Sequence, residues 1–108
     1  METDLRKEDR KIIFLYEFGG TALILYAINI AGNPVAVVFS IMAAVLVCGP
    51  ITGAHFNPAV STACLISHIN PKDALNSFVL MVVAEISGAL FGVLLAFLSL
   101  TTSNAAQT

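Results

Sequence analysis

The chain has 108 residues, of which 57% are hydrophobic and only 11% are charged. Such a chain could not cover itself with polar surface, so we expect one membrane-embedded unit rather than a soluble domain. The net charge of −2, with no basic stripe beyond the N-terminus, argues against a nucleic-acid partner.

The N-terminal part predicts an arm and two spans. Residues 1–11 mix acidic and basic side chains, which indicates a solvated arm and no cleaved targeting sequence. Residues 12–30 carry one ionisable group, Glu17, and are long enough to cross a bilayer. After a short turn, Asn33 and Pro34 have the pattern of a helix start, and a second span follows at about 34–51.

The next stretch, residues 52–67, carries no acidic or basic group. Asn57 can cap a helix whose first position is Pro58, where the missing N–H costs nothing. The apolar run that follows reaches only about 15 Å, roughly half of a bilayer core. Irregular backbone at that depth is stable only where it lines a watery cavity or is buried in protein. We therefore expect a re-entrant loop and half-helix that line a pore.

A polar loop, again with an Asn-Pro helix start, leads to a third span at about 74–100 and a polar tail at 101–108. On that span Ala84, Gly88, Gly92 and Ala96 recur every fourth residue, and Gly19 and Gly20 lie on the first span. Such small residues let helix backbones approach closely. The expected fold class is an all-α membrane protein with three transmembrane helices and one re-entrant half-helix.

All five Lys and Arg residues precede the first or the third span. Three spans and a re-entrant segment place those two positions on one side, which the positive-inside rule makes cytoplasmic. We expect an integral multi-pass protein with a cytoplasmic N-terminus and an external C-terminus. This bias also argues against an inverted copy of the same chain completing a channel.

Residues 52–61, with the sequence TGAHFNPAVS, resemble the first Asn-Pro-Ala signature of the aquaporin and aquaglyceroporin family. Residues 16–23 resemble the first membrane helix of that family and residues 84–92 its third. The resemblance runs from about residue 12 to residue 100 and covers half of a usual member, which has six spans and two such motifs. It implies one aquaporin-like inverted repeat unit, residues 12–100, as a piece of a longer chain or as a half that needs a complement.

The resemblance implies where a pore would lie. Asn57 would donate its amide hydrogens to a permeating oxygen, and the N-terminus of the short helix would repel cations. An aliphatic Val37 at the outer filter, where relatives often carry an aromatic, leaves room for solutes larger than water. The alternative for Val37 and Ile41 is lipid or core packing. The expected motif residues are Asn57, Pro58 and Ala59, and the expected lining residues are Val37, Ile41, Gly53, Ala54, His55 and Val60.

Two carboxyl groups lie within the expected spans, where ionised groups usually face the protein interior. The resemblance implies that Glu17 accepts hydrogen bonds from the backbone of the re-entrant loop. Glu85 stands where the family usually has Gln, and a protonated Glu could replace that amide as a donor. We predict that Glu85→Gln preserves the fold.

The remaining polar residues favour simpler interpretations. Cys48 and Cys64 are expected to be small buried hydrophobes rather than a disulfide or a metal site. His55 could fix the loop, line the pore or both, and His68 is expected at the surface. No metal-ligand spacing, cofactor motif or catalytic constellation is present in the sequence, so we expect neither an enzyme nor a metal or cofactor site.

The leading functional interpretation is half of a channel for water or small uncharged solutes such as glycerol. Its expected partners are the lipid bilayer, the solute, and a homo- or hetero-oligomeric complement that supplies the other half. The alternative is a non-conducting membrane subunit that modulates the assembly or trafficking of full-length channels.

Overall fold

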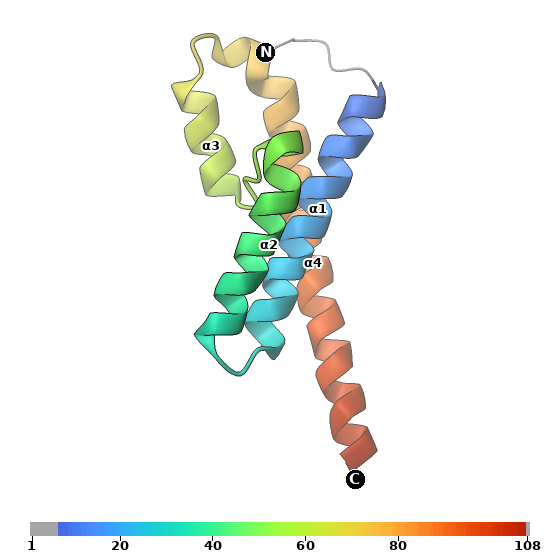
Figure 1. Cartoon of the computed structure of the whole chain (residues 1–108). Coiled ribbons are helices and arrows are strands. Elements are labelled where there is room, and N and C mark those ends of the chain that lie inside the picture. Colours follow the sequence, from blue (N-terminus) through green and yellow to red (C-terminus); the bar gives the residue numbers. More distant parts are fainter. Residues whose placement is uncertain (1–6, 108) are drawn as a thin grey trace.

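The computed structural model describes residues 7–107, which form four helices and no strand (Figure 1). Three of them are apolar and long enough to cross a membrane, whereas the ten-residue α3 is apolar but too short. The expected fold class is confirmed: the described chain is all-helical, with three candidate spanning helices and one shorter apolar helix. The four helices are α1 (Lys7–Ile30), α2 (Pro34–Thr52), α3 (Pro58–Ser67) and α4 (Pro71–Gln107).

Helices α1, α2 and α4 run side by side, and α3 occupies only part of the molecule's length (Figure 1). After α2 ends, the chain turns back toward the middle of the molecule, and α3 then rises to the end from which the chain came. The five residues 53–57 separate the two helices, so α3 is not a continuation of α2. Helix α3 packs against α4.

Asparagine and proline start both α2 and α3. Asn33 and Asn57 each have extended backbone, and each side-chain oxygen accepts a hydrogen bond from a main-chain N–H, of Ala36 at 3.0 Å and of Ala59 at 2.8 Å. A proline fits after each cap because the first helical position needs no N–H donor. The two caps have the same chemistry, but they lie in different surroundings.

The small residues of α4 form its contact with α1. Ala84, Gly88, Gly92 and Ala96 are all buried. A Cβ atom added at Gly88 would lie 2.5 Å from the carbonyl oxygen of Phe18, and one at Gly92 would lie 2.3 Å from that of Ala22. The two backbones are thus in direct contact, which confirms the close approach expected for this ridge.

The expectation for α1 was wrong in its detail. Gly19 has nothing within 4 Å of a Cβ built on it, so it brings no helix backbone closer. Gly20 instead makes room for the ring of Phe56, which a Cβ would meet at 2.0 Å. Phe56 comes from the loop before α3 and is buried with Ala44 and Cys48 of α2. The apolar core therefore includes a loop residue.

Helix α4 continues through Gln107, although the sequence indicates a polar tail without periodicity from residue 101. The hydroxyl groups of Thr101 and Thr102 donate to the carbonyls four residues earlier, at 2.7 and 2.8 Å. These bonds satisfy the polar side chains within the helix, so polarity alone does not end it. At the other terminus, α1 begins at Lys7, inside the expected arm, and residues 1–6 lie outside the described residues.

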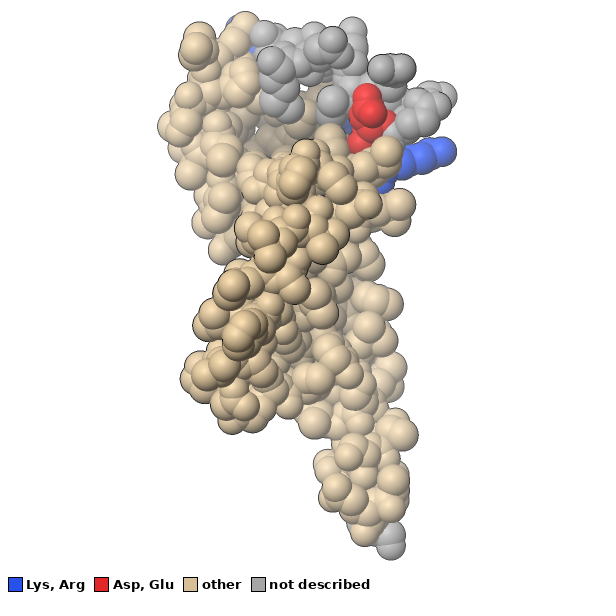
Figure 2. All heavy atoms as spheres, viewed as in Figure 1, with Lys and Arg blue, Asp and Glu red and all other residues tan. Residues whose placement is uncertain are grey.

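Charged side chains gather at one end of the molecule. Figure 2 shows the Lys, Arg, Asp and Glu atoms of that face where α1 begins, while the rest of the face is uncharged. Two carboxylates are exceptions in the sequence, since Glu17 and Glu85 lie within α1 and α4, but both are fully buried.

Candidate functional site

The connection between α2 and α3, residues 53–57, has an unusual backbone. Gly53 ends α2 in the left-handed region at φ 90°, and its N–H donates to the carbonyl of Gly49 at 2.9 Å. Ala54 and Phe56 also have positive φ, 54° in each case. For residues with a side chain this conformation costs about 1–3 kcal/mol each, so it persists only where neighbouring groups enforce it.

Glu17 is the group that holds this connection. Its carboxylate is 0% exposed and accepts hydrogen bonds from the main-chain N–H groups of His55, at 3.2 Å, and Phe56, at 2.8 Å. The hydroxyl of Thr52 donates to the same carboxylate at 2.5 Å and accepts from the N–H of Ala54 at 3.1 Å. A carboxylate can accept all of these donors because its two oxygens offer several lone pairs.

Every N–H of residues 53–56 thus has a partner on α1 or at the end of α2. Within the described residues, no hydrogen bond reaches the carbonyl oxygens of the same four residues. These consecutive carbonyl oxygens are therefore free to accept hydrogen bonds from a solute, and Gly53, Ala54 and His55 are not buried.

Asn57 follows these carbonyl groups in the chain, at the start of α3, and is exposed. Its Oδ1 is occupied by the N–H of Ala59, which leaves the amide hydrogens without a partner among the described residues. The N-terminus of a helix also carries roughly half a positive charge. The site therefore offers a sequence of carbonyl acceptors followed by an amide donor, next to a positive helix end.

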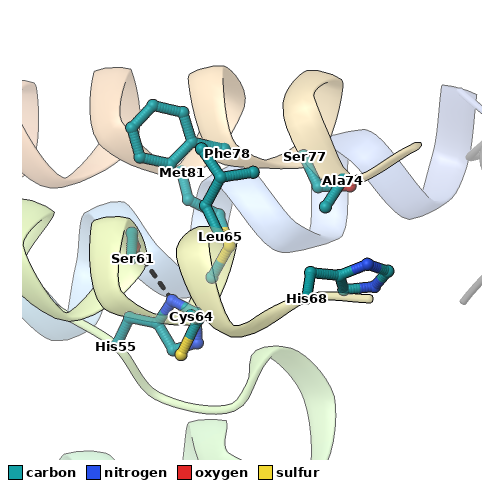
Figure 3. A pocket seen from close by; sticks show the side chains of 9 residues that line it. All are labelled: His55, Ser61, Cys64, Leu65, His68, Ala74, Ser77, Phe78 and Met81. Carbon is teal, nitrogen blue, oxygen red and sulfur yellow. Dashed lines mark hydrogen bonds between the residues drawn. The ribbon is translucent and has the colours of Figure 1, made fainter. Parts of the chain in front are cut away.

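A second set of polar side chains lies behind α3. Glu85, which is 0% exposed, accepts a hydrogen bond from the Ser61 hydroxyl at 2.7 Å. The Oγ of Ser61 lies 2.9 Å from Nδ1 of His55, the dashed line in Figure 3. The three residues connect α4, α3 and the preceding loop through side chains alone.

Next to this set is a cavity of about 80 Å³ between α3 and α4. Figure 3 shows His55 and Ser61 at one end and His68 at the other, with Cys64 between them. Its remaining lining residues are Leu65, Ala74, Ser77, Phe78 and Met81. The residues that the structure describes contain no group of His, Cys, Asp and Glu side chains suited to a metal ion.

A larger apolar groove of about 390 Å³ opens on the other side of Asn57. Two buried polar atoms at its wall, Oγ1 of Thr21 and Oε2 of Glu85, have no hydrogen-bond partner among the described residues. Buried polar atoms are normally paired, so these two are exceptions. The groove is lined by Thr21, Leu25, Phe56, Asn57, Pro58, Glu85, Ile86, Ala89, Leu90 and Val93.

A comparison with models of protein families finds a match to the major intrinsic protein family over residues 12–108. The chain belongs to the major intrinsic protein family. Neither the search of curated proteins nor the search of solved structures found a match.

Membership of the major intrinsic protein family, together with the three long apolar helices, makes this an integral multi-pass membrane protein. Members of the family are channels for water or small solutes and not enzymes.

The structure brings most of the expected site residues to one region, around the loop before α3 and the start of α3. Glu17 and Glu85 flank the loop and α3 from behind, and the exposed Asn57, Ala59 and Val60 lie at the start of α3, with Pro58 half-buried.

Val37 and Ile41 are placed differently. They lie on α2, where Val37 is half-buried and Ile41 is 38% exposed. Neither residue lines the cavity beside Ser61 or the groove beside Asn57. Their expected place at a filter stays a prediction.

Sequence reasoning missed three residues of this region. Thr52 and Ser61 lie within the recognised motif, but only the structure shows their bonds to Glu17 and Glu85. Cys64 was expected to be buried, which is wrong: it is exposed, whereas Cys48 is buried. Helical spacing could have indicated this, because positions three and seven after Asn57, those of Val60 and Cys64, fall on the same face of α3.

Proposed function

We propose that the chain forms one half of a passive pathway for water or small uncharged solutes such as glycerol. Asn57, with Pro58 and Ala59, marks the centre of this pathway. A solute passes the free carbonyls of the loop and then the amide of Asn57. The lining residues are Val37, Ile41, Gly53, Ala54, His55 and Val60, with Cys64 added from the structure, while Glu17 and Glu85 support them from behind.

The single observation that supports this best is the start of α3. Its N-terminus lies in the middle of the molecule rather than at an end, and the Asn57 amide hydrogens have no partner among residues 7–107 (Figure 1). A neutral solute can exchange its water contacts for these groups, whereas the positive helix end opposes a cation. Covalent chemistry has no part in the proposed function.

The pathway needs a complement, because this chain has groups for one wall only. Thr21 and Glu85 line an open groove beside Asn57, and a complement that covers this groove would exclude lipid from it. That complement is the remainder of a longer chain, a partner protein or further copies. We also propose that the end with the N-terminus is cytoplasmic, since the Lys and Arg residues gather there.

The test is permeability with a matched pair of variants. The full chain is reconstituted in liposomes, and osmotic shrinkage and glycerol uptake are followed by light scattering. Asn57→Asp keeps the oxygen that caps α3 but removes the amide donor and adds a negative charge. Asn33→Asp makes the same change at the cap of α2, outside the proposed pathway. Where further copies of the chain supply the complement, we expect permeability above that of empty liposomes, lost in Asn57→Asp and kept in Asn33→Asp.

Equal loss in both variants would contradict the assignment of Asn57, because it would reflect damage to a helix cap. No permeability of the chain alone, combined with co-purification of a longer homologue from cells, would instead favour a non-conducting subunit that modulates full-length channels.

A further inference from the structure

We propose that Glu85 acts through Ser61 to hold His55 in one tautomer, with the proton on Nδ1 and the lone pair on Nε2. Glu85 is then a positioning residue, and His55 presents an acceptor to the pathway. Only this last consequence rests on the proposed function, because the tautomer itself is a property of the folded chain.

The three side chains form a continuous hydrogen-bonded set. The Ser61 hydroxyl is 2.7 Å from Oε1 of Glu85 and 2.9 Å from Nδ1 of His55. Glu85 is 0% exposed and Ser61 is 3% exposed, so water does not compete at this end. In the part of the chain that the structure describes, the Ser61 hydroxyl donates a hydrogen bond to Oε1 of Glu85.

The direction of these bonds follows from counting protons. A serine hydroxyl has one hydrogen, and the bond from Ser61 to Oε1 of the buried Glu85 uses it. Once Ser61 donates to Glu85, its oxygen can only accept from His55, so Nδ1 must carry hydrogen. A neutral imidazole has a single N–H, and Nε2 is then left with a lone pair.

Nε2 of His55 lies near the main chain of residues 53–56, whose N–H groups all donate to other partners. A Cβ built on Gly53 would be 3.4 Å from this atom, so the ring edge lies against the unoccupied stretch of main chain. No hydrogen bond to Nε2 occurs in the described part of the chain. His55 therefore adds an acceptor to the free carbonyls of residues 53–56, next to the donor of Asn57.

This arrangement defines a solute class for the pathway. A solute beside His55 must offer hydrogens, and one beside Asn57 must offer an oxygen. Water and small polyols satisfy both requirements, whereas a solute with acceptors alone does not. The other tautomer, with its hydrogen on Nε2, would present a donor at His55. The pathway would then no longer offer acceptors up to Asn57 and a donor at Asn57.

The experiment measures the imidazole nitrogens directly. The full chain, labelled with ¹⁵N-histidine, is placed in lipid bilayers at mildly alkaline pH, where an imidazole is neutral. The chain has two histidines, and His68→Gln assigns their signals. We expect Nδ1 of His55 to resonate as a protonated nitrogen and Nε2 as an unprotonated one.

Variants then test the role of the relay. Ser61→Ala removes the acceptor for Nδ1–H, and we expect the signals of His55 to shift toward the other tautomer. Ser61→Thr keeps a hydroxyl and Glu85→Gln keeps an acceptor oxygen, so both should retain the wild-type signals. The signals of His68, which bonds to the backbone of Asn70, should not move in any of the three and serve as the control for an intact fold.

An unprotonated Nδ1 of His55 in the wild-type chain would overturn the proposal, and this measurement does not depend on any variant. The proposal also fails if Ser61→Ala retains both the fold and the wild-type signals. Since the spectra do not measure conduction, a chain without permeability could still show the expected tautomer, and the two proposals fail separately.

Discussion

At the scale of single residues, two buried carboxyl groups with the same chemistry have opposite requirements. Glu17 accepts from three donors and uses both of its oxygens. Glu85 accepts from Ser61 with one oxygen, and the other has no hydrogen-bond partner in the part of the chain that the structure describes. Because Glu17 and Glu85 are both buried, we expect each position to tolerate only a substitution that preserves its hydrogen bonds.

We therefore predict that Glu17→Gln and Glu85→Gln differ sharply. In Glu17→Gln the new NH₂ group would face an N–H or hydroxyl donor, and leaving a buried donor unpaired costs about 1–3 kcal/mol. In Glu85→Gln the amide oxygen accepts from Ser61, and we expect the stability to change little. Thermal unfolding in detergent, followed by circular dichroism, measures both.

Glu85→Gln is the internal control for Glu17→Gln, because both remove one carboxyl oxygen at a fully buried position. Equal midpoints for the two variants would mean that the loop before α3 does not depend on Glu17.

At the scale of elements, the contact between α1 and α4 depends on two missing side chains. The carbonyl oxygens of Phe18 and Ala22 occupy the space that a Cβ would take at Gly88 and Gly92. Backbone atoms cannot move aside as a flexible side chain can. The position of α4 in turn sets that of Glu85, so helix packing and the site behind α3 are linked.

Gly92→Ala should therefore separate α1 from α4 and destabilise the chain by about 1–3 kcal/mol, as overpacking of a close contact does. Gly19→Ala is the matched control, since nothing lies within 4 Å of the added methyl group. The midpoint of unfolding should fall in the first variant and stay or rise in the second, because alanine favours helix. A tolerated Gly92→Ala would show that the two helices are not in direct contact.

At the scale of the whole molecule, the two ends differ in charge. Among the described residues, the charged side chains other than Glu17 and Glu85 lie at the end of the molecule where α1 begins, while α4 extends as helix to Gln107 at the opposite end (Figure 1). A bilayer would accept the middle, where the side chains of Glu17 and Glu85 are buried, and leave both ends in water. The open groove beside Asn57 lies within that middle.

We predict that reporters fused to the N-terminus and to the C-terminus lie on opposite sides of the membrane, with the N-terminus in the cytoplasm. Replacing all five Lys and Arg residues with Gln should weaken or mix this orientation, because the basic residues set it. Reporters active only outside the cytoplasm, compared at the two ends, provide the measurement. A single orientation that survives the replacement would contradict the charge argument.

The sequence by itself determined the elements of this protein. Spans follow from runs of apolar residues, and the starts of α2 and α3 follow from Asn33-Pro34 and Asn57-Pro58, because capping is a local interaction between neighbours. The small-residue ridge on α4 was also readable, since its period of four places the residues on one face.

The tertiary structure decided what those residues contact. That Thr52 donates to Glu17, that Gly20 leaves space for Phe56, and that Ser61 joins Glu85 to His55 all depend on pairs of residues far apart in the chain. The exposure of Cys64 and the continuation of α4 past residue 100 likewise depend on neighbours that periodicity does not describe. Local patterns specify where a helix begins, but only packing selects which of its faces is covered.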